Sequence, residues 1–286
     1  MNKGMSLPTM RVSIPPLSMP PPPSLALRFC PAGPPSLERI EAADACVVSI
    51  PGRYCMSHVL VGPDCLALVD VGSNADLSLI EAVLAWLDKP LTWVLASHLH
   101  FDHCLGLDRI AMQHGARVGL HPLAHATAQG GAKLRGPGLW SLRLFWHTWL
   151  WQGAPLIAPE DRAEGLHFGF PWSANRFSAE LGPALGEGHA LAGLPGWRVL
   201  QTPGHADEAI CLFHEEAGFL ITGDTLRNFR GGEWNPLLTD GEAYRRSMAR
   251  LESLEIQAVF PGHGPNILGG DMWRRLRPLP GLAGRV

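Results

Sequence analysis

The stretch Ser97-His98-Leu99-His100-Phe101-Asp102-His103 places three imidazoles and one carboxylate within six residues, directly after the apolar run at residues 91–96. These side chains suit zinc, iron or manganese, and the absence of cysteine from the cluster argues against a closed structural zinc site. The apolar run predicts a buried strand, and α/β sheets bind ligands at the carboxyl ends of their strands. We therefore expect a catalytic metal centre after this strand.

The composition of the 286-residue chain is that of a globular protein, with 46% hydrophobic residues and a mean hydropathy of +0.06. Its 23 basic and 26 acidic residues leave a formal charge of −3, which predicts no nucleic-acid partner. The expected partner is a small-molecule substrate. Residues 1–36 are rich in Pro and lack periodicity, which is typical of a tail or of an arm packed along the domain. Residues 37–286 predict one large domain, and its oligomeric state stays open.

The cysteines and the apolar runs predict a reducing location. Six cysteines are scattered without a C-x-x-C pair, as expected of reduced core thiols. Prolines at 15–16 and 20–23 interrupt any apolar segment near the start of the sequence, so no secretory signal is expected. No run of about 18 apolar residues predicts a membrane span. We expect a cytoplasmic protein with no membrane partner.

Short apolar runs separated by turn residues predict a domain rich in strands from residue 45 onward. Gly62-Pro63-Asp64 separates two of these runs and predicts a hairpin. Amphipathic segments between other runs predict helices, and the alternation indicates an α/β fold. The expected strands are 46–50, 56–61, 65–70, 91–96, 117–120, 197–201, 209–214, 219–222 and 258–260, and the expected helices are 76–88, 105–114 and 241–254.

Residues 122–195 interrupt this alternation and hold five of the ten tryptophans. Two interpretations stay open: a helical insertion whose aromatic side chains form their own small core, or a lid that covers the substrate. The aromatic residues of the region are Trp140, Phe145, Trp146, Trp149, Trp151, Phe168, Phe170, Trp172 and Phe177.

Three further candidate ligands each follow a later predicted strand: His205, Asp224 and His263. The glycine before each of them lets the backbone turn sharply, so that side chains can converge on one edge of the sheet. Together with the first cluster they make seven ligands, enough for two metal positions.

These ordered motifs, H-x-H-x-D-H, P-G-H, G-D and G-H, resemble those of the metallo-β-lactamase superfamily over residues 45–268. The resemblance implies an αββα four-layer sandwich of two mixed sheets with outer helices. It implies a first metal held by His98, His100 and His205, a second held by Asp102, His103 and His263, and Asp224 as a bridge. Asp70 matches the family's aspartate that supports the ligand loop through hydrogen bonds.

The ligand set predicts hydrolysis. Two cations, most simply two zinc ions with iron or manganese as alternatives, lower the pKa of a shared water to about 7 and so supply a hydroxide. Asp224 would take part by bridging the cations, and Asp102 could receive or return a proton. No G-x-S-x-G motif supplies a serine nucleophile. The sequence thus predicts a dinuclear metal hydrolase that cleaves a small ester, thioester or lactone.

Branches of the superfamily differ around these ligands. The segments near His205 and Asp224 are similar to those of glyoxalase II thioesterases. Only 23 residues follow His263, so the glutathione-binding C-terminal extension of that group is not expected. Three alternatives stay open: a persulfide dioxygenase-like enzyme with one iron, a β-lactamase, and a catalytically inactive metal-binding scaffold.

Candidate substrate-binding residues lie beside the predicted ligands. Arg227, Arg230 and Trp234 follow Asp224, and an arginine there could bind a substrate carboxylate, although solvated surface arginines would give the same sequence. His121 follows a predicted strand and could line the pocket. The other histidines have no partner at metal-ligand spacing and are expected at the surface or in the core: His58, His114, His125, His147, His167, His189 and His214.

Overall fold

Two β-sheets lie face to face in the computed structural model, which describes residues 9–12, 32–136, 149–150, 156–163, 165, 167–170 and 173–277. The first sheet has seven strands in chain order, antiparallel from β1 to β5 and parallel from β5 to β7. The turn at residues 62–64 joins β4 to β5, which confirms the predicted hairpin. The strands are β1 (Met10–Val12), β2 (Glu38–Ala42), β3 (Ala45–Pro51), β4 (Met56–Val61), β5 (Leu66–Val69), β6 (Leu91–Leu95) and β7 (Arg117–Gly119).

The second sheet has five strands in the order β14-β13-β10-β9-β8. Strands β10 and β13 are parallel, and a helix connects them, as the crossover between parallel strands requires. A separate two-stranded hairpin, β11 (Leu226–Arg227) and β12 (Glu233–Trp234), follows β10. The strands of the sheet are β8 (Trp197–Gln201), β9 (Ile210–His214), β10 (Phe219–Gly223), β13 (Ala258–Pro261) and β14 (Ile267–Leu268).

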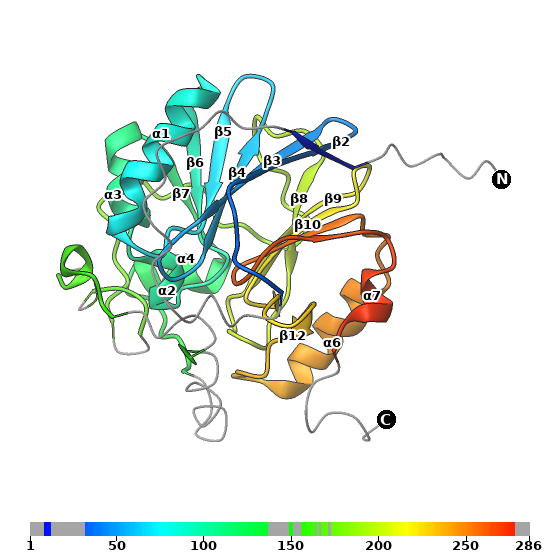
Figure 1. The fold of residues 1–286 in the computed structure, drawn as a ribbon. Coiled ribbons are helices and arrows are strands. Elements are labelled where there is room, and N and C mark those ends of the chain that lie inside the picture. The colour runs from blue at the N-terminus through cyan, green and yellow to red at the C-terminus, as the bar shows by residue number, and fades with distance from the viewer. Residues whose placement is uncertain are drawn as a thin grey trace.

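Helices cover both outer faces, so the molecule has four layers (Figure 1). Helices α1 (Leu77–Leu87) and α3 (Leu107–His114) pack on the first sheet, and α6 (Gly241–Glu252) and α7 (Met272–Arg275) pack on the second. Between the sheets, Leu60 and Leu95 from the first join Ile221 and Phe260 from the second in one buried cluster. Each such fully buried side chain contributes about 1.5–3 kcal/mol. The predicted αββα sandwich is confirmed.

Helix α6 shows how local sequence produces this packing. Asp240 caps its N-terminus, because its side chain accepts hydrogen bonds from the backbone N–H of Glu242 and Ala243 at 3.0 and 2.9 Å. Tyr244 and Leu251 lie on its buried face, seven residues apart. The helix thereby delivers the Tyr244 hydroxyl to the interior next to the second sheet.

The N-terminal segment supplies structure that the sequence did not predict. Strand β2 precedes the first expected strand, and β1 pairs antiparallel with it, with Met10 opposite Glu41. Farther along, the N–H of Ala32 donates to the carbonyl of Phe229 at 3.0 Å. The described parts of residues 1–36 therefore include an arm that packs along the domain.

The aromatic region between β7 and β8 is attached to the first sheet. It contains α4 (Pro122–Ala128) and the 3-10 helix η3 (Pro159–Asp161). Phe168 is buried in the core beneath the first sheet, and the Phe177 ring lies 4.9 Å from it. The expectation of a separate aromatic core is therefore wrong for these two rings. The predictions for Trp140, Phe145, Trp146, Trp151 and Trp172 fall outside the described residues.

A buried aspartate anchors the same region. Asp161 is fully buried and accepts hydrogen bonds from the Ser73 hydroxyl at 2.6 Å and from the Asn74 backbone N–H at 2.7 Å. Tyr54 adds a second attachment, since its hydroxyl accepts from the Ala158 N–H at 2.8 Å. The segment around η3 is thus fixed to the loops that follow β3 and β5.

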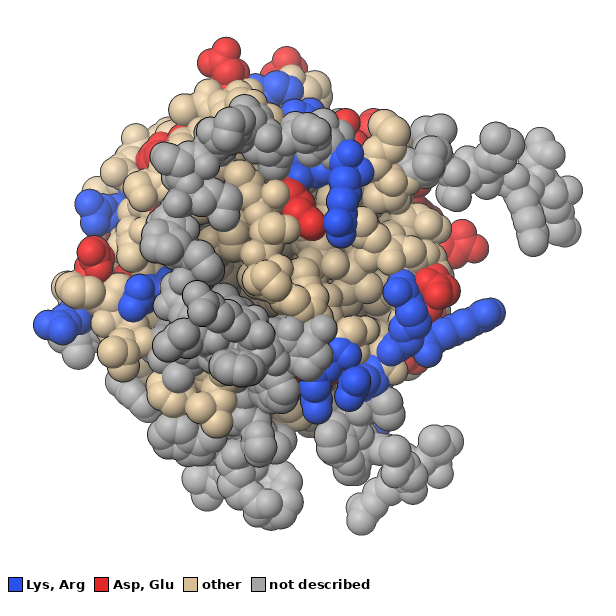
Figure 2. All heavy atoms as spheres, viewed as in Figure 1, with Lys and Arg blue, Asp and Glu red and all other residues tan. Residues whose placement is uncertain are grey.

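The surface carries charges of both signs. On the face shown in Figure 2, Lys and Arg side chains gather mainly where Figure 1 shows α7, with acidic side chains beside them. Within α7, Arg275 pairs with Asp271 at 3.0 Å. A mixed surface differs from the basic field of a typical nucleic-acid binder, and the absence of such a partner stays a prediction. No helix among the described residues is long and apolar enough to cross a membrane.

Candidate metal centre

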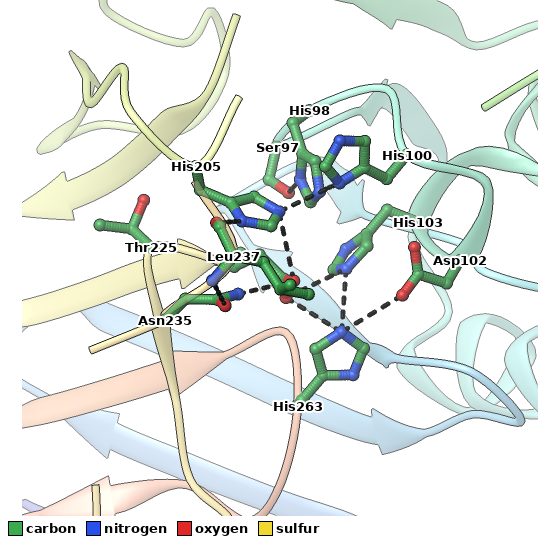
Figure 3. A network of polar contacts seen from close by, with 12 residues as sticks. Ser97, His98, His100, Asp102, His103, His205, Thr225, Asn235, Leu237 and His263 are labelled. Carbon is green, nitrogen blue, oxygen red and sulfur yellow. Dashed lines mark hydrogen bonds and ion pairs between the residues drawn. The ribbon is translucent and has the colours of Figure 1, made fainter. Parts of the chain in front are cut away.

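Seven side chains from the ends of four strands converge at one edge of the two sheets (Figure 3). The first four follow β6, with two on the loop and two on the short helix α2 (Phe101–Cys104). The other three follow β8, β10 and β13. All except two are buried, and those two are half-buried. The seven are His98, His100, Asp102, His103, His205, Asp224 and His263.

Three of these side chains surround the position implied for a first metal. His100 Nδ1 lies 3.0 Å from His98 Nε2 and 3.0 Å from His205 Nε2. One potential ligand atom from each residue lies within 4.8 Å of the others. The three nitrogens could therefore hold one metal ion.

A second group lies beside it. His103 Nε2 is 3.3 Å from His263 Nε2, which is itself 3.4 Å from Asp102 Oδ2. Asp224 lies between the groups, because its Oδ1 is 3.0 Å from His263 Nε2 and its Oδ2 is 3.4 Å from His205 Nε2. These two groups contain the residues that the resemblance implies for each metal, and a third possible group joins His98, His103 and Asp224. The bridging role of Asp224 stays a prediction.

The outer hydrogen bonds of the imidazoles decide which ring nitrogen faces inward. His103 Nδ1 lies 2.9 Å from a carboxylate oxygen of Asp70, and His205 Nδ1 lies 2.6 Å from the carbonyl of Leu237. Both partners only accept, so each Nδ1 carries a hydrogen. His205 Nε2 therefore presents a lone pair to the cluster, and His103 Nε2 would do so once a cation displaces its second proton.

The same reasoning applies to His98. Its Nδ1 lies 3.0 Å from the Ser97 hydroxyl, whose hydrogen is donated to Asp70 at 2.7 Å. The Ser97 oxygen therefore accepts from His98 Nδ1, and His98 Nε2 also presents a lone pair. Asp224 Oδ1 is buried without a hydrogen bond from any described residue. Lone pairs and carboxylate oxygens that face one another in this way fit a cation between them.

Burial and charge act on the imidazoles in opposite directions. Burial and the neighbouring His103 and His100 lower the pKa of His98 well below its ordinary value, and burial lowers the pKa of His205 to about 4. These two rings are neutral at pH 7 and able to ligate. For His103 burial also acts downward, but the Asp224 and Asp70 carboxylates outweigh it and raise its pKa well above the ordinary value. A cation bound there would compete with that proton.

Asp70 supports the ligand loop, as the resemblance implies. Its Oδ1 accepts from the Ser97 N–H at 2.7 Å, and its Oδ2 accepts from the Ser97 hydroxyl and from His103 Nδ1. One buried carboxylate thus orients His98, through Ser97, and His103 directly. The predicted hydrogen-bonding role of Asp70 is confirmed.

Asp224 is held by residues that the sequence did not reveal. Asn235 Nδ2 donates to Asp224 Oδ2 at 3.1 Å, and the Asn235 N–H donates to the Tyr244 hydroxyl at 2.8 Å. The Tyr244 hydroxyl donates in turn to the Thr225 carbonyl at 2.5 Å. Helix α6 therefore fixes the Asp224 carboxylate through Asn235, the residue that follows β12.

Close packing explains the glycine before His263. A Cβ atom on Gly262 would lie 2.6 Å from His103 Cε1 and 3.0 Å from Asp224 Oδ1. No larger residue fits between these two candidate ligands. The sequence predicted a sharp turn at this glycine, and the structure adds that its missing side chain leaves room for the metal centre.

The predicted substrate-binding residues lie outside the ligand cluster. Arg227 is buried and pairs with Glu233 at 3.1 Å, and the half-exposed Arg230 pairs with the same carboxylate at 2.5 Å. Trp234 is 3% exposed and stacks on Trp273, which gives its ring a packing position in the core under α6 and α7. Contact of these residues with substrate stays a prediction.

His121 occupies the N-cap of α4. Its Nδ1 accepts a hydrogen bond from the Leu123 N–H at 3.0 Å, and burial lowers its pKa to about 4. A small cavity of about 20 Å³ lies instead beside His263 and is lined by Tyr54 and Phe229 among others. Its volume is about that of one water. The place of His121 in a substrate pocket stays a prediction.

The remaining histidines behave as expected where they are described. His58 is a buried core residue whose Nε2 lies 3.1 Å from the Pro261 carbonyl. His114 contacts Glu81 on the surface, and His125 contacts the Gly182 carbonyl. The prediction for His147 falls outside the described residues.

Comparisons with known proteins agree with this geometry. The sequence model of the metallo-beta-lactamase superfamily matches residues 50–263. The probable metallo-hydrolase YqjP of Bacillus subtilis (strain 168) is 29% identical over 244 residues, 78% of this chain and 72% of that protein. The acyl-coenzyme A thioesterase MBLAC2 of Gallus gallus is 28% identical over 66% of this chain, which spans 61% of that relative's length.

A solved structure shows the same fold. The metallo-beta-lactamase family protein TTHA1429 from Thermus thermophilus has a TM-score of 0.55 and 25% sequence identity, over 81% of this chain and 76% of that chain.

Proposed function

Because this chain belongs to the metallo-β-lactamase superfamily, we propose that it is a dinuclear metal hydrolase that cleaves a small ester, thioester or lactone. The observation that carries the proposal is the convergence of seven ligands in two adjoining groups, with Asp224 between them. The similarity to a probable metallo-hydrolase and to a thioesterase supports hydrolysis and the thioester among the substrates.

Two bound cations, zinc most simply, would supply a hydroxide near neutral pH and a Lewis acid for the carbonyl oxygen. The protein's own part is to hold the ligands in place before substrate arrives. Asp70 fixes His103 and the Ser97 loop, and Asn235 fixes Asp224. This rigid second layer of hydrogen bonds favours one geometry of the site.

Asp102 is the better placed of the two carboxylates to exchange a proton. Its side chain is 14% exposed, against 5% for Asp224. Burial acts to raise its pKa, but the hydrogen bond and the charge of His263 outweigh burial and lower it. We assign Asp102 the relay of a proton, which it would accept from the attacking water and pass to the leaving group, and Asp224 the bridging of the metal ions.

Metal analysis combined with a substrate panel tests the proposal. The purified protein is assayed for zinc, iron and manganese and then given an ester, a lactone, a thioester and a β-lactam. Two equivalents of zinc with hydrolysis of an ester, thioester or lactone support it. His100→Ala should lose metal and hydrolysis together, while His114→Ala, which removes a surface imidazole, should keep both.

Other outcomes would contradict the proposal, each in its own way. One iron per chain with oxygen uptake on a persulfide would establish the dioxygenase alternative. Turnover of the β-lactam alone would make the protein a lactamase. Bound metal without turnover on any class would leave a metal-binding scaffold.

A further inference from the structure

A groove of about 670 Å³ lies at the C-terminal end of α4, away from the seven ligands. Its walls come from the turn after α4 and from the segment at residues 173–176. Among the described residues that line it, two are basic and none is acidic. They include Thr127, Gly130, Lys133, Leu134, Ser173 and Arg176.

The two cations of the groove have no counter-ion in the described parts of the chain. Lys133 and Arg176 are both exposed and form no ion pair there. Arg135, two residues beyond Lys133, is different, because it makes two hydrogen bonds to Asp207 at 2.5 and 2.7 Å. Lys133 and Arg176, in contrast, have no carboxylate partner among the described residues, so their charges are available to a ligand.

A buried hydroxyl adds a second, independent observation. Ser173 lines the groove, is 9% exposed, and its hydroxyl has no hydrogen-bond partner among the described residues. Buried polar groups are nearly always paired, so a hydroxyl without a partner favours a ligand that provides one. A hydroxyl beside two cations suits an oxyanion with several acceptor oxygens.

Residues beyond both ends of α4 interact with Asp207, which lies two residues after the ligand His205. The helix has seven residues and is about 10 Å long. Its N-cap His121 lies within the electrostatic influence of Asp207, two residues after the ligand His205. Arg135 follows Lys133 by two residues, which span about 7 Å of chain at most. It binds the same Asp207. The groove residue Lys133 and the candidate ligand His205 are thus linked through Arg135 and Asp207.

We infer that this groove binds the phosphate groups of the substrate's carrier, a phosphorylated thiol such as coenzyme A. The inference rests on the proposed function and selects the thioester among its substrates. Its volume is in the range of a drug-sized ligand, which a single small anion would not fill. Lys133 and Arg176 hold the phosphates, and the Ser173 hydroxyl donates to a phosphate oxygen.

The test compares two thioesters with the same acyl group, one on coenzyme A and one on N-acetylcysteamine, which lacks phosphate. Lys133→Ala and Arg176→Ala should each raise KM for the coenzyme A thioester about threefold to tenfold. Neither should change kcat, or KM for the short thioester. Arg274→Ala removes an exposed cation from α7 and should leave both substrates unaffected.

Calorimetric titration with free coenzyme A gives a readout that needs no turnover. The wild-type protein should bind it, more weakly at high salt, and the double variant Lys133→Ala/Arg176→Ala should lose that binding. Binding without hydrolysis of either thioester would sink the proposed function and leave the groove standing. No binding by the wild-type protein, or an equal rise in KM for both thioesters, would overturn the groove.

Discussion

Asp70 Oδ2 lies 2.9 Å from His103 Nδ1, and this contact determines that His103 Nε2 faces the candidate metal centre. Asp70 has a left-handed backbone conformation, with φ of 59°, which asparagine also tolerates. Asp70→Asn therefore keeps the backbone but replaces one acceptor by an amide donor, which cannot accept from His103. We expect metal affinity to fall about 10–100-fold, as measured by competition with a chromophoric chelator.

Asp88→Asn provides the matched control for this change. Asp88 is exposed, ends α1 and has a left-handed φ of 51°, but it lies outside the ligand cluster. It should retain full metal affinity. If Asp70→Asn binds metal as tightly as the wild-type protein, the orienting role of Asp70 is refuted.

Metal removal should destabilise the whole fold. Without a cation, the inward lone pairs of His98 and His205 lose the positive charge they would share, and the buried Asp224 carboxylate relies on Asn235 and on protonation of neighbouring imidazoles. A ligand present at about 1,000 times its Kd stabilises by about 4.1 kcal/mol, which corresponds to roughly 8–16 °C in a domain of this size. Scanning calorimetry with and without a chelator should show a drop of this order, reversed when zinc is added back.

Glu233 pairs with one buried arginine and one partly exposed arginine, and the two ion pairs should differ in their contribution to stability. Arg227 and Glu233 are both buried, so Arg227→Ala should lower the free energy of unfolding by about 3–5 kcal/mol. The Arg230 side chain is 35% exposed, and Arg230→Ala should cost no more than about 1 kcal/mol. Urea unfolding measures both.

Kinetics then tests the predicted contact with substrate. If Arg230 binds a substrate carboxylate, Arg230→Ala should raise KM for an acidic substrate while stability changes little. Unchanged KM for acidic and neutral substrates would remove Arg230 from the substrate site. A stability loss larger for Arg230→Ala than for Arg227→Ala would contradict the structural assignment of the buried pair.

The ligands could be predicted from sequence because each is encoded locally. A ligand such as His205 or His263 is a metal-binding residue type placed after an apolar strand and a glycine, and these signals need no knowledge of distant contacts. The hairpin at residues 62–64 and most strands were accessible for the same reason. The identity of the candidate ligands at this edge of the sheets therefore follows from residue type and strand order.

Apart from Asp70, which the family resemblance implied, the residues that orient the ligands could not be predicted in this way. Tyr244 has the helical spacing of a core residue, and only the packing of α6 shows that its hydroxyl reaches Asn235. The Leu237 carbonyl that orients His205 carries no side-chain signal at all. Strand β1 was missed because an alternation of only three residues is too short to indicate a strand, and it forms by pairing with β2.

Asp76 should make stability depend on pH. Burial raises its pKa to about 7, although it accepts a hydrogen bond from the Arg53 N–H at 2.8 Å. The folded pKa lies above the unfolded value near 3.9, so its favourable contribution is present below about pH 4 and is lost as pH rises through 7. Asp76→Asn removes this loss and keeps an acceptor for Arg53.

The free energy of unfolding of Asp76→Asn, relative to that of the wild-type protein, should increase with pH. From pH 5 to pH 8, Asp76→Asn should gain about 1–3 kcal/mol of unfolding free energy relative to the wild-type protein. Urea unfolding at both pH values, with the same metal loading, measures it. A difference that does not vary with pH would show that Asp76 keeps an ordinary pKa in the folded state.

Glu208 tests whether the backbone between His98 and His100 needs its own support. It is 1% exposed, its Oε1 accepts from the Leu99 N–H at 3.2 Å, and burial raises its pKa. Glu208→Ala leaves that N–H unpaired, at a cost of about 1–3 kcal/mol, and frees the loop that carries both histidines. Glu208→Gln keeps an acceptor oxygen and removes a buried charge. We therefore expect the Ala variant to lose metal affinity and to change the visible spectrum of the cobalt-substituted protein, while the Gln variant retains both. Equal behaviour of the two variants would mean that the Leu99 hydrogen bond does not hold the ligand loop in place.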